Sequence, residues 1–84
     1  MPYVLDGRLS PGQLVALTLA ANGLTASQIG TRLDTTETGI HLRLNAAARS
    51  LGAKSRAHAV AIAIARGLIQ TTDIHLPDQK ERAA

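Results

Sequence analysis

Two helical segments of this sequence are separated by almost no connecting chain. The first follows a capping residue, Thr25, and carries Ile29 and Leu33 at helical spacing. The second begins at Thr36, so only two residues separate it from Leu33. Two helices joined by so tight a turn must cross at a steep angle, and the sequence therefore predicts a helix-turn-helix motif.

Glycine and proline divide the rest of the chain into segments whose apolar residues recur at helical rather than alternating spacing. We therefore expect an all-α fold. Ser10 and Gln13 have the spacing of a capping box, with Pro11 in the first turn, and Asn22 and Gly23 supply a left-handed stop. The first helix is expected to bury three residues: Leu14, Leu17 and Ala21.

The helix that begins at Thr36 and ends at Leu51 is divided into two faces. Thr36 or Thr35 caps it, Glu37 suits its first turn because of the helix dipole, and Gly52 terminates it. Its inner stripe is apolar: Ile40, Leu44, Ala47, Ala48 and Leu51. Its outer face is mixed: Thr38, Leu42, Asn45, Ala46 and Arg49. Amide, isobutyl and guanidinium groups on one face suit adenine edges, thymine methyls and guanine or phosphate in the major groove of DNA.

Basic residues are concentrated in the middle of the chain. Residues 32–66 contain six basic and two acidic residues, a net charge of +4, whereas residues 71–84 carry a net charge of −1. A basic middle indicates a polyanionic partner, although ordinary solvated helix surfaces would explain the charge alone equally well. The groups expected to bind the DNA backbone lie at the start of the helix from Thr36 to Leu51 and just beyond its end: Thr36, Thr38, Lys54, Ser55 and Arg56.

A fourth helix, capped by Ser55 and ending near Arg66, has almost no polar side. One side is expected to pack on the domain: Ala59, Val60, Ala63 and Ile64. The residues that then point away from it are His58, Ala61, Ile62 and Ala65. Nothing further in so short a chain covers them, so we expect a homodimer interface. The alternative is an exposed, mildly apolar helix, because alanine costs little when solvated.

Length and composition limit the class of protein. With 84 residues there is room for one domain with a small core, and the absence of cysteine excludes disulfides and thiolate metal sites. The longest apolar-rich stretch, residues 57–65, is too short to span a membrane, and the N-terminus lacks the layout of a signal peptide. A cytoplasmic protein that does not act at a membrane is therefore expected.

Catalysis is not expected from this chain. Its three histidines, His41, His58 and His75, lie on separate predicted elements. None of them has a carboxylate or a nucleophile at a spacing that builds a catalytic or metal site. We therefore expect no enzyme activity, no metal and no cofactor.

Several motifs of this chain occur in the same order in one known family. They are LSP (9–11), ANGLT (21–25), QIGTRLD (28–34), TET (36–38), LGAKSRAHAV (51–60) and GLI (67–69). On these motifs, residues 9–69 resemble the DNA-binding domain of the LuxR family of bacterial transcription regulators, which also occurs in NarL-type response regulators and the spore regulator GerE. We accordingly divide the chain into an N-terminal lead at residues 1–8, this domain, and a flexible polar tail at residues 70–84.

The resemblance implies a compact four-helix bundle that binds pseudo-palindromic promoter DNA as a homodimer. The third helix would lie in the major groove and the fourth would form the dimer contact, with RNA polymerase as a further partner. The family's base-reading positions fall on His41, Leu42 and Asn45, to which the outer face adds Arg49. Its backbone contacts fall on Thr36, Thr38, Lys54, Ser55 and Arg56.

Four positions depart from the family pattern. The family usually has Glu at Gln13, Thr at Gly39, Lys or Arg at His41, and His at Arg43. Gly39 removes a hydroxyl near the phosphates and loosens the helix by ~1 kcal/mol relative to alanine, while Arg43 adds a cation that could bind the backbone instead. Gly39 and the scarcity of lysine on this helix favour a second hypothesis, a protein-interaction module that pairs with another regulator without binding specific DNA.

Overall fold

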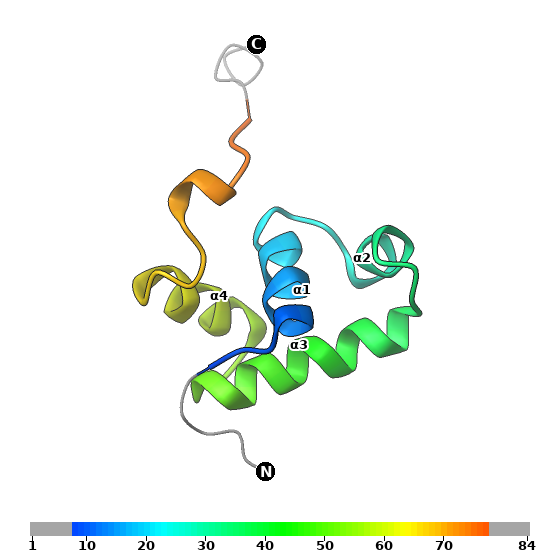
Figure 1. Ribbon diagram of the computed structural model, residues 1–84, viewed down its shortest axis with the longest axis horizontal. Helices are drawn as coiled ribbons and strands as arrows, with labels where there is room; N and C mark the ends of the chain where they lie inside the picture. Colours follow the sequence, from blue (N-terminus) through cyan, green and yellow to red (C-terminus); the bar gives the residue numbers. More distant parts are fainter. Residues whose placement is uncertain (1–7, 78–84) are drawn as a thin grey trace.

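The fold is built around one long helix, α3, against which the other helices pack. The computed structural model describes residues 8–77, and among these the chain forms four α-helices, one short 3-10 helix and no β-strand, which confirms the predicted all-α fold. The elements are α1 (Pro11–Ala21), α2 (Ala26–Arg32), α3 (Glu37–Leu51), α4 (Arg56–Ala65) and the 3-10 helix η1 (Thr71–Asp73). In Figure 1, α1 packs against α3, with α2 near the beginning of α3 and α4 near its end.

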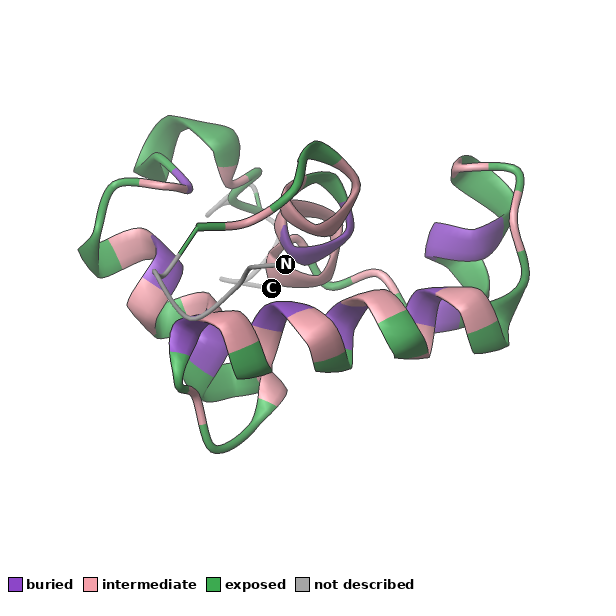
Figure 2. Cartoon of the chain, turned by 60° about the horizontal axis from the view of Figure 1, so that its bottom comes forward, coloured by how far each residue is buried: buried purple, intermediate pink, exposed green. Residues whose placement is uncertain are grey.

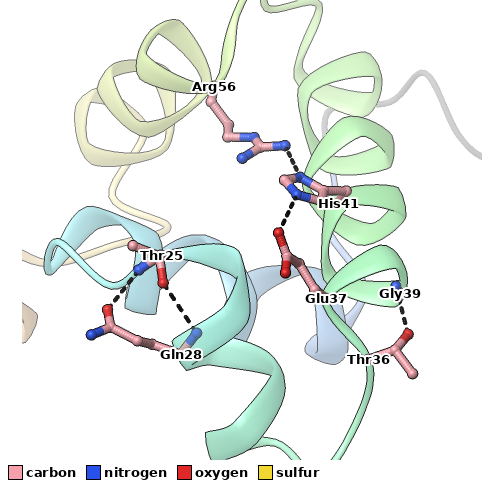
Figure 3. Close-up of polar contacts among 7 residues, drawn as sticks. All are labelled: Thr25, Gln28, Thr36, Glu37, Gly39, His41 and Arg56. Atoms are coloured by element: carbon pink, nitrogen blue, oxygen red, sulfur yellow. Dashed lines mark hydrogen bonds and ion pairs between the residues drawn. The ribbon is translucent and has the colours of Figure 1, made fainter.

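Reciprocal side-chain bonds begin the first two helices. The Ser10 hydroxyl accepts from the Gln13 backbone N–H at 3.1 Å, and the Gln13 side chain accepts from the Ser10 N–H at 3.1 Å. Thr25 and Gln28 make the same pair of bonds at the start of α2, at 3.1 and 2.9 Å (Figure 3). The capping box predicted at Ser10 and the cap predicted at Thr25 are therefore confirmed.

The next two helices begin with a single hydroxyl cap. Thr36 Oγ1 accepts from the Gly39 N–H at 2.9 Å, and Ser55 Oγ accepts from the His58 N–H at 3.1 Å. Gly52 ends α3 in the left-handed conformation, with a φ of 69°, which a glycine adopts without steric cost. These caps confirm the predicted boundaries of α3 and α4 to within a residue.

Gly30 allows α2 to approach the start of α3 closely. The Thr35 backbone N–H donates to the Gly30 carbonyl at 2.8 Å, and Asp34 between them takes a left-handed φ of 59°. A Cβ atom at Gly30 would lie 2.9 Å from the Thr35 carbonyl oxygen, closer than Cβ atoms come to backbone in proteins. The missing side chain at this buried position therefore sets how tightly the two helices meet.

The core between α3 and the other helices is aliphatic. Its largest fully buried side chains come from α1, α2, α3 and the segment after α4: Leu17, Ile29, Ile40, Leu44 and Ile69. The predicted inner stripe of α3 is confirmed, because four of its five residues are buried and Ala48 is half-buried. Figure 2 shows these buried residues recurring along the side of α3 that faces α1.

The stripes predicted for α1 and α2 are confirmed in part. Leu17 and Ile29 are fully buried, whereas the other predicted members are half-buried against the core: Leu14, Ala21 and Leu33. Ala16 is buried although the sequence did not indicate it. Since α1 is apolar on almost every side, periodicity does not define its inner face.

The segment after α4, expected to be a flexible tail, is tied to α1 through Asn22. The Asn22 side chain donates to the Asp73 carbonyl at 3.0 Å and accepts from the His75 N–H at 2.6 Å. Ile74 between these bonds is half-buried against the core. Residues 70–75 are thus part of the packed fold in this structure, while residues 1–7 of the predicted lead and 78–84 of the predicted tail lie outside the described residues.

Replacing Gly30 with alanine should destabilise the protein. Alanine is the better helix former by about 1 kcal/mol, but a Cβ atom pressed against backbone costs more, so we expect a net loss of about 1–2 kcal/mol in the free energy of unfolding. Urea denaturation followed by circular dichroism measures this loss. Gly12→Ala is the matched control, because its Cβ would meet only the Arg43 guanidinium at an ordinary 3.8 Å. Equal stability of the two variants would contradict the tight α2–α3 contact.

Candidate nucleic-acid interface

One exposed stripe of α3 carries most of the residues predicted to read bases. Leu42 is 65% exposed, and Asn45 and Arg49 are exposed on the turns that follow. Thr38 lies exposed one turn earlier on the same side. Figure 2 shows exposed residues recurring along the edge of α3 that faces away from α1. The stripe therefore offers hydroxyl, isobutyl, amide and guanidinium groups to one partner surface.

The hydroxyls predicted to bind phosphates also cap helices. Thr36 and Ser55 each accept a backbone N–H, at 2.9 and 3.1 Å respectively. A hydroxyl carries its own hydrogen as well, so each cap can still donate to a phosphate oxygen. Both residues are exposed, and the N–H groups of the first turn that have no partner inside the helix lie beside them. Capping and phosphate binding are therefore compatible at both positions.

Gly39 leaves space for two hydroxyls at the start of α3. A Cβ atom at this position would lie 3.1 Å from Thr35 Oγ1 and 3.2 Å from Thr36 Oγ1. Both contacts are tight, and both involve side chains rather than backbone. A side chain at position 39 would therefore require the Thr35 and Thr36 hydroxyls to shift by a few tenths of an ångström.

His41 connects α3 to the start of α4 instead of projecting freely (Figure 3). Its Nδ1 lies 2.7 Å from Nη2 of Arg56, and its Nε2 lies 3.5 Å from Oε2 of Glu37, one turn earlier. The ring is half-buried between the two helices. Sequence reasoning assigned Glu37 only a role at the helix dipole. The Glu37–His41 spacing of four residues could have indicated a pair, but no local signal points to Arg56.

Two further cations flank the stripe in different ways. Lys54 is exposed, and its backbone N–H donates to Nδ1 of His58 at 3.0 Å, which orients that ring at the start of α4. Arg43 is half-buried, with its guanidinium within 4 Å of the place where a Cβ on Gly12 would stand. Arg43 thus lies against the first turn of α1, and its predicted contact with the DNA backbone stays a prediction.

The outer side of α4 is made of small side chains. His58, Ala61 and Ala65 are exposed, as the sequence predicted. Ile62 is half-buried and packs against the core, so the prediction that it points away from the domain is wrong in part. The inner residues behave as expected, with Ala59 and Ala63 buried and the two larger ones half-buried: Val60 and Ile64.

Within residues 8–77 no three carboxylate or imidazole side chains lie close enough together to hold a metal ion. No helix in the same range is long and apolar enough to cross a membrane. Comparison of the chain with models of protein families finds no match, and comparison with curated proteins finds none either. The proposals that follow therefore depend on the geometry of the named residues and on the sequence resemblance to the LuxR family.

Gly39→Ala should stabilise the protein modestly. Alanine favours the helix by ~1 kcal/mol, and the Thr35 hydroxyl can rotate away from the new methyl group, so we expect the free energy of unfolding to rise by about 0.5 kcal/mol. Thermal denaturation compared with the wild type measures the change. A loss of stability would mean that either the Thr35 side chain or the capping Thr36 hydroxyl cannot give way. Gly39→Ala combined with Thr35→Ala would recover the gain only in the first case.

Proposed function

We propose that this chain is a sequence-specific, DNA-binding transcription regulator that acts as a homodimer on pseudo-palindromic promoter DNA. In this proposal α2 and α3 form a helix-turn-helix motif, and α3 lies in the major groove. The observation that carries the proposal is the exposed stripe of α3 at Thr38, Leu42, Asn45 and Arg49, which is bounded by capped helix starts and basic residues.

The tight turn between α2 and α3 supports the helix-turn-helix assignment. Gly30 brings the two helices together at the start of α3, and the α2 side chains that face the core leave the stripe uncovered. A recognition helix needs this arrangement, because the preceding helix must hold it firmly while its outer side stays open to the groove. The resemblance to the LuxR family leads to the same assignment.

The chemistry of the stripe suits direct readout of bases. Asn45 can make two hydrogen bonds to an adenine edge, Leu42 can contact a thymine methyl group, and Arg49 can reach guanine. From Leu42 to Arg49 the helix rises about 10 Å, which is the length of about three base pairs. One protomer would therefore read a short half-site, and a second protomer would be needed for a site of useful length.

The groups at the two ends of α3 suit phosphate binding. Thr36 stands at its beginning, and Lys54 and Ser55 follow its end, while the Arg56 guanidinium reaches back to His41 in the first half of the helix. Such contacts fix the register and orientation of a protein on the duplex without carrying sequence information. In this proposal the exposed stripe of α3 reads the bases, and the hydroxyl and basic groups beside it bind the phosphate backbone.

Substitutions in the stripe and in its flanks should have different effects on DNA binding. Asn45→Ala should relax base preference at one position of sites selected from a random pool, at a cost of about 1–3 kcal/mol for the preferred base. Lys54→Gln should weaken binding to every duplex alike and reduce the slope of log K against log salt by about 1. Fluorescence anisotropy over a range of salt concentrations measures both.

Arg66→Gln is the control for Lys54→Gln. It removes the same charge from an exposed residue at the far end of α4, away from the proposed DNA interface, and should leave affinity and salt slope nearly unchanged. Because Arg66 follows Ala65 of the proposed dimer face, sedimentation velocity of both variants checks that assembly is unaltered. If the wild-type chain bound selected and random duplexes equally, sequence-specific binding would be excluded. The second candidate, a module that pairs with another regulator without binding specific DNA, would then take its place.

Ala61→Glu should disrupt the proposed homodimer. Ala61 is exposed in the middle of α4, so a charged side chain is tolerated by the folded monomer but would be buried between two protomers. Sedimentation velocity should show monomers where the wild type is dimeric, and cooperative binding to two half-sites should be lost. Ser27→Glu, which adds the same charge on the exposed side of α2, should leave the dimer intact. A monomeric wild-type protein would refute the interface.

A further inference from the structure

We propose that His41 is a positioning residue, which holds the Arg56 guanidinium ready for a DNA phosphate instead of reading a base itself. The inference rests on the function proposed above and assigns His41 a role different from the one its place in the sequence suggests. The juxtaposition that carries it is the chain of contacts from Glu37 through His41 to Arg56, which joins α3 to the first turn of α4 (Figure 3).

The partners of the ring suggest a donor or acceptor role for each of its two nitrogens. A guanidinium is a donor only, so the 2.7 Å contact with Arg56 requires Nδ1 of His41 to be an unprotonated acceptor. The neutral ring then carries its hydrogen on Nε2, and this is the nitrogen that lies 3.5 Å from the Glu37 carboxylate. In this one tautomer Arg56 donates to Nδ1, and the hydrogen on Nε2 is on the side of the Glu37 carboxylate.

Both nitrogens of the ring already face a partner within the protein. Imidazole has two nitrogens, and one faces Arg56 while the other faces Glu37. To contact a base edge, His41 would have to turn Nε2 away from Glu37 or give up the bond between Nδ1 and Arg56. The ring is also half-buried beside α4, whereas Leu42 and Asn45 on the neighbouring stripe are exposed and face the proposed groove.

Arg56 keeps most of its bonding capacity in this arrangement. A guanidinium has five N–H donors in a planar fork, and the bond to His41 uses one of them. The fork can therefore donate to a phosphate while it remains bound to the ring. A long side chain that is already held in place loses less conformational freedom when the phosphate arrives, which is the usual advantage of preorganisation.

A double-mutant cycle on DNA binding tests the coupling. The probes are a duplex selected from a random pool and a random duplex of the same length, each measured with the wild type, His41→Ala, Arg56→Ala and the double variant. We expect Arg56→Ala to weaken binding to both duplexes about tenfold, the effect of losing one charge-assisted hydrogen bond. His41→Ala should weaken both about threefold or more, but should have no further effect once Arg56 is alanine.

His41→Asn is the rescue variant. Asparagine places Oδ1 as many bonds from Cβ as Nδ1 is in histidine, so it supplies an acceptor for Arg56, and the two residues have similar helix propensities. We expect affinity within about twofold of the wild type. His41→Gln, whose polar atoms stand one bond further out, should recover less. Circular dichroism of each variant checks that the fold is intact.

The possible outcomes separate the inference from the proposed function. A wild-type chain that binds no duplex would overturn both. Specific binding with additive effects of His41→Ala and Arg56→Ala would overturn the inference alone, and so would a change of base preference at one position in His41→Ala. Failure of His41→Asn to restore affinity would exclude the acceptor role. Non-additive losses, unchanged base preference and rescue by asparagine together would support it.

Discussion

The close approach of α2 to the start of α3 is the contact on which the rest of the structure depends. Gly30 has no Cβ, and the space it leaves is filled by the backbone of the turn at Thr35 and Thr36. That contact fixes the crossing of the two helices and also fixes where the Thr36 hydroxyl caps α3. The orientation of α3, and with it the direction of its exposed stripe, therefore follows from a position that carries no side chain.

Local chemistry explains why so much of the fold could be predicted. Each helix begins at a hydroxyl that accepts a backbone N–H three residues later, and such caps are visible in the sequence at Ser10, Thr25, Thr36 and Ser55. The inner stripe of α3 was also predictable, because its polar and apolar faces are well separated. In α1 and α4, where nearly every side is apolar, the same reasoning gave Leu17 and Ala63 correctly but misjudged Ile62.

Contacts between distant parts of the chain could not be predicted in this way. The bond between His41 and Arg56 joins residues 15 positions apart, and those of Asn22 reach residues more than 50 positions away. Ile69 is buried although it follows the glycine that ends α4, where periodicity has stopped. Such contacts depend on how the helices are placed in space, which local spacing does not specify. The contacts of His41 with α4 and the packing of the segment after α4 were therefore not predicted from the sequence.

The small side chains of α4 link stability to assembly. Ala59 and Ala63 are fully buried, and their small side chains let the helix backbone lie close to α1 and α3. The exposed alanines on the opposite side, Ala61 and Ala65, are equally small. A core of this size, without aromatic residues among the fully buried side chains, leaves little reserve of stability. Under the proposed function, any partner that binds only the folded state adds to that stability. Dimerisation through α4 would then hold Arg56, at the beginning of the same helix, more firmly beside His41, so that assembly and the proposed phosphate contact would strengthen each other.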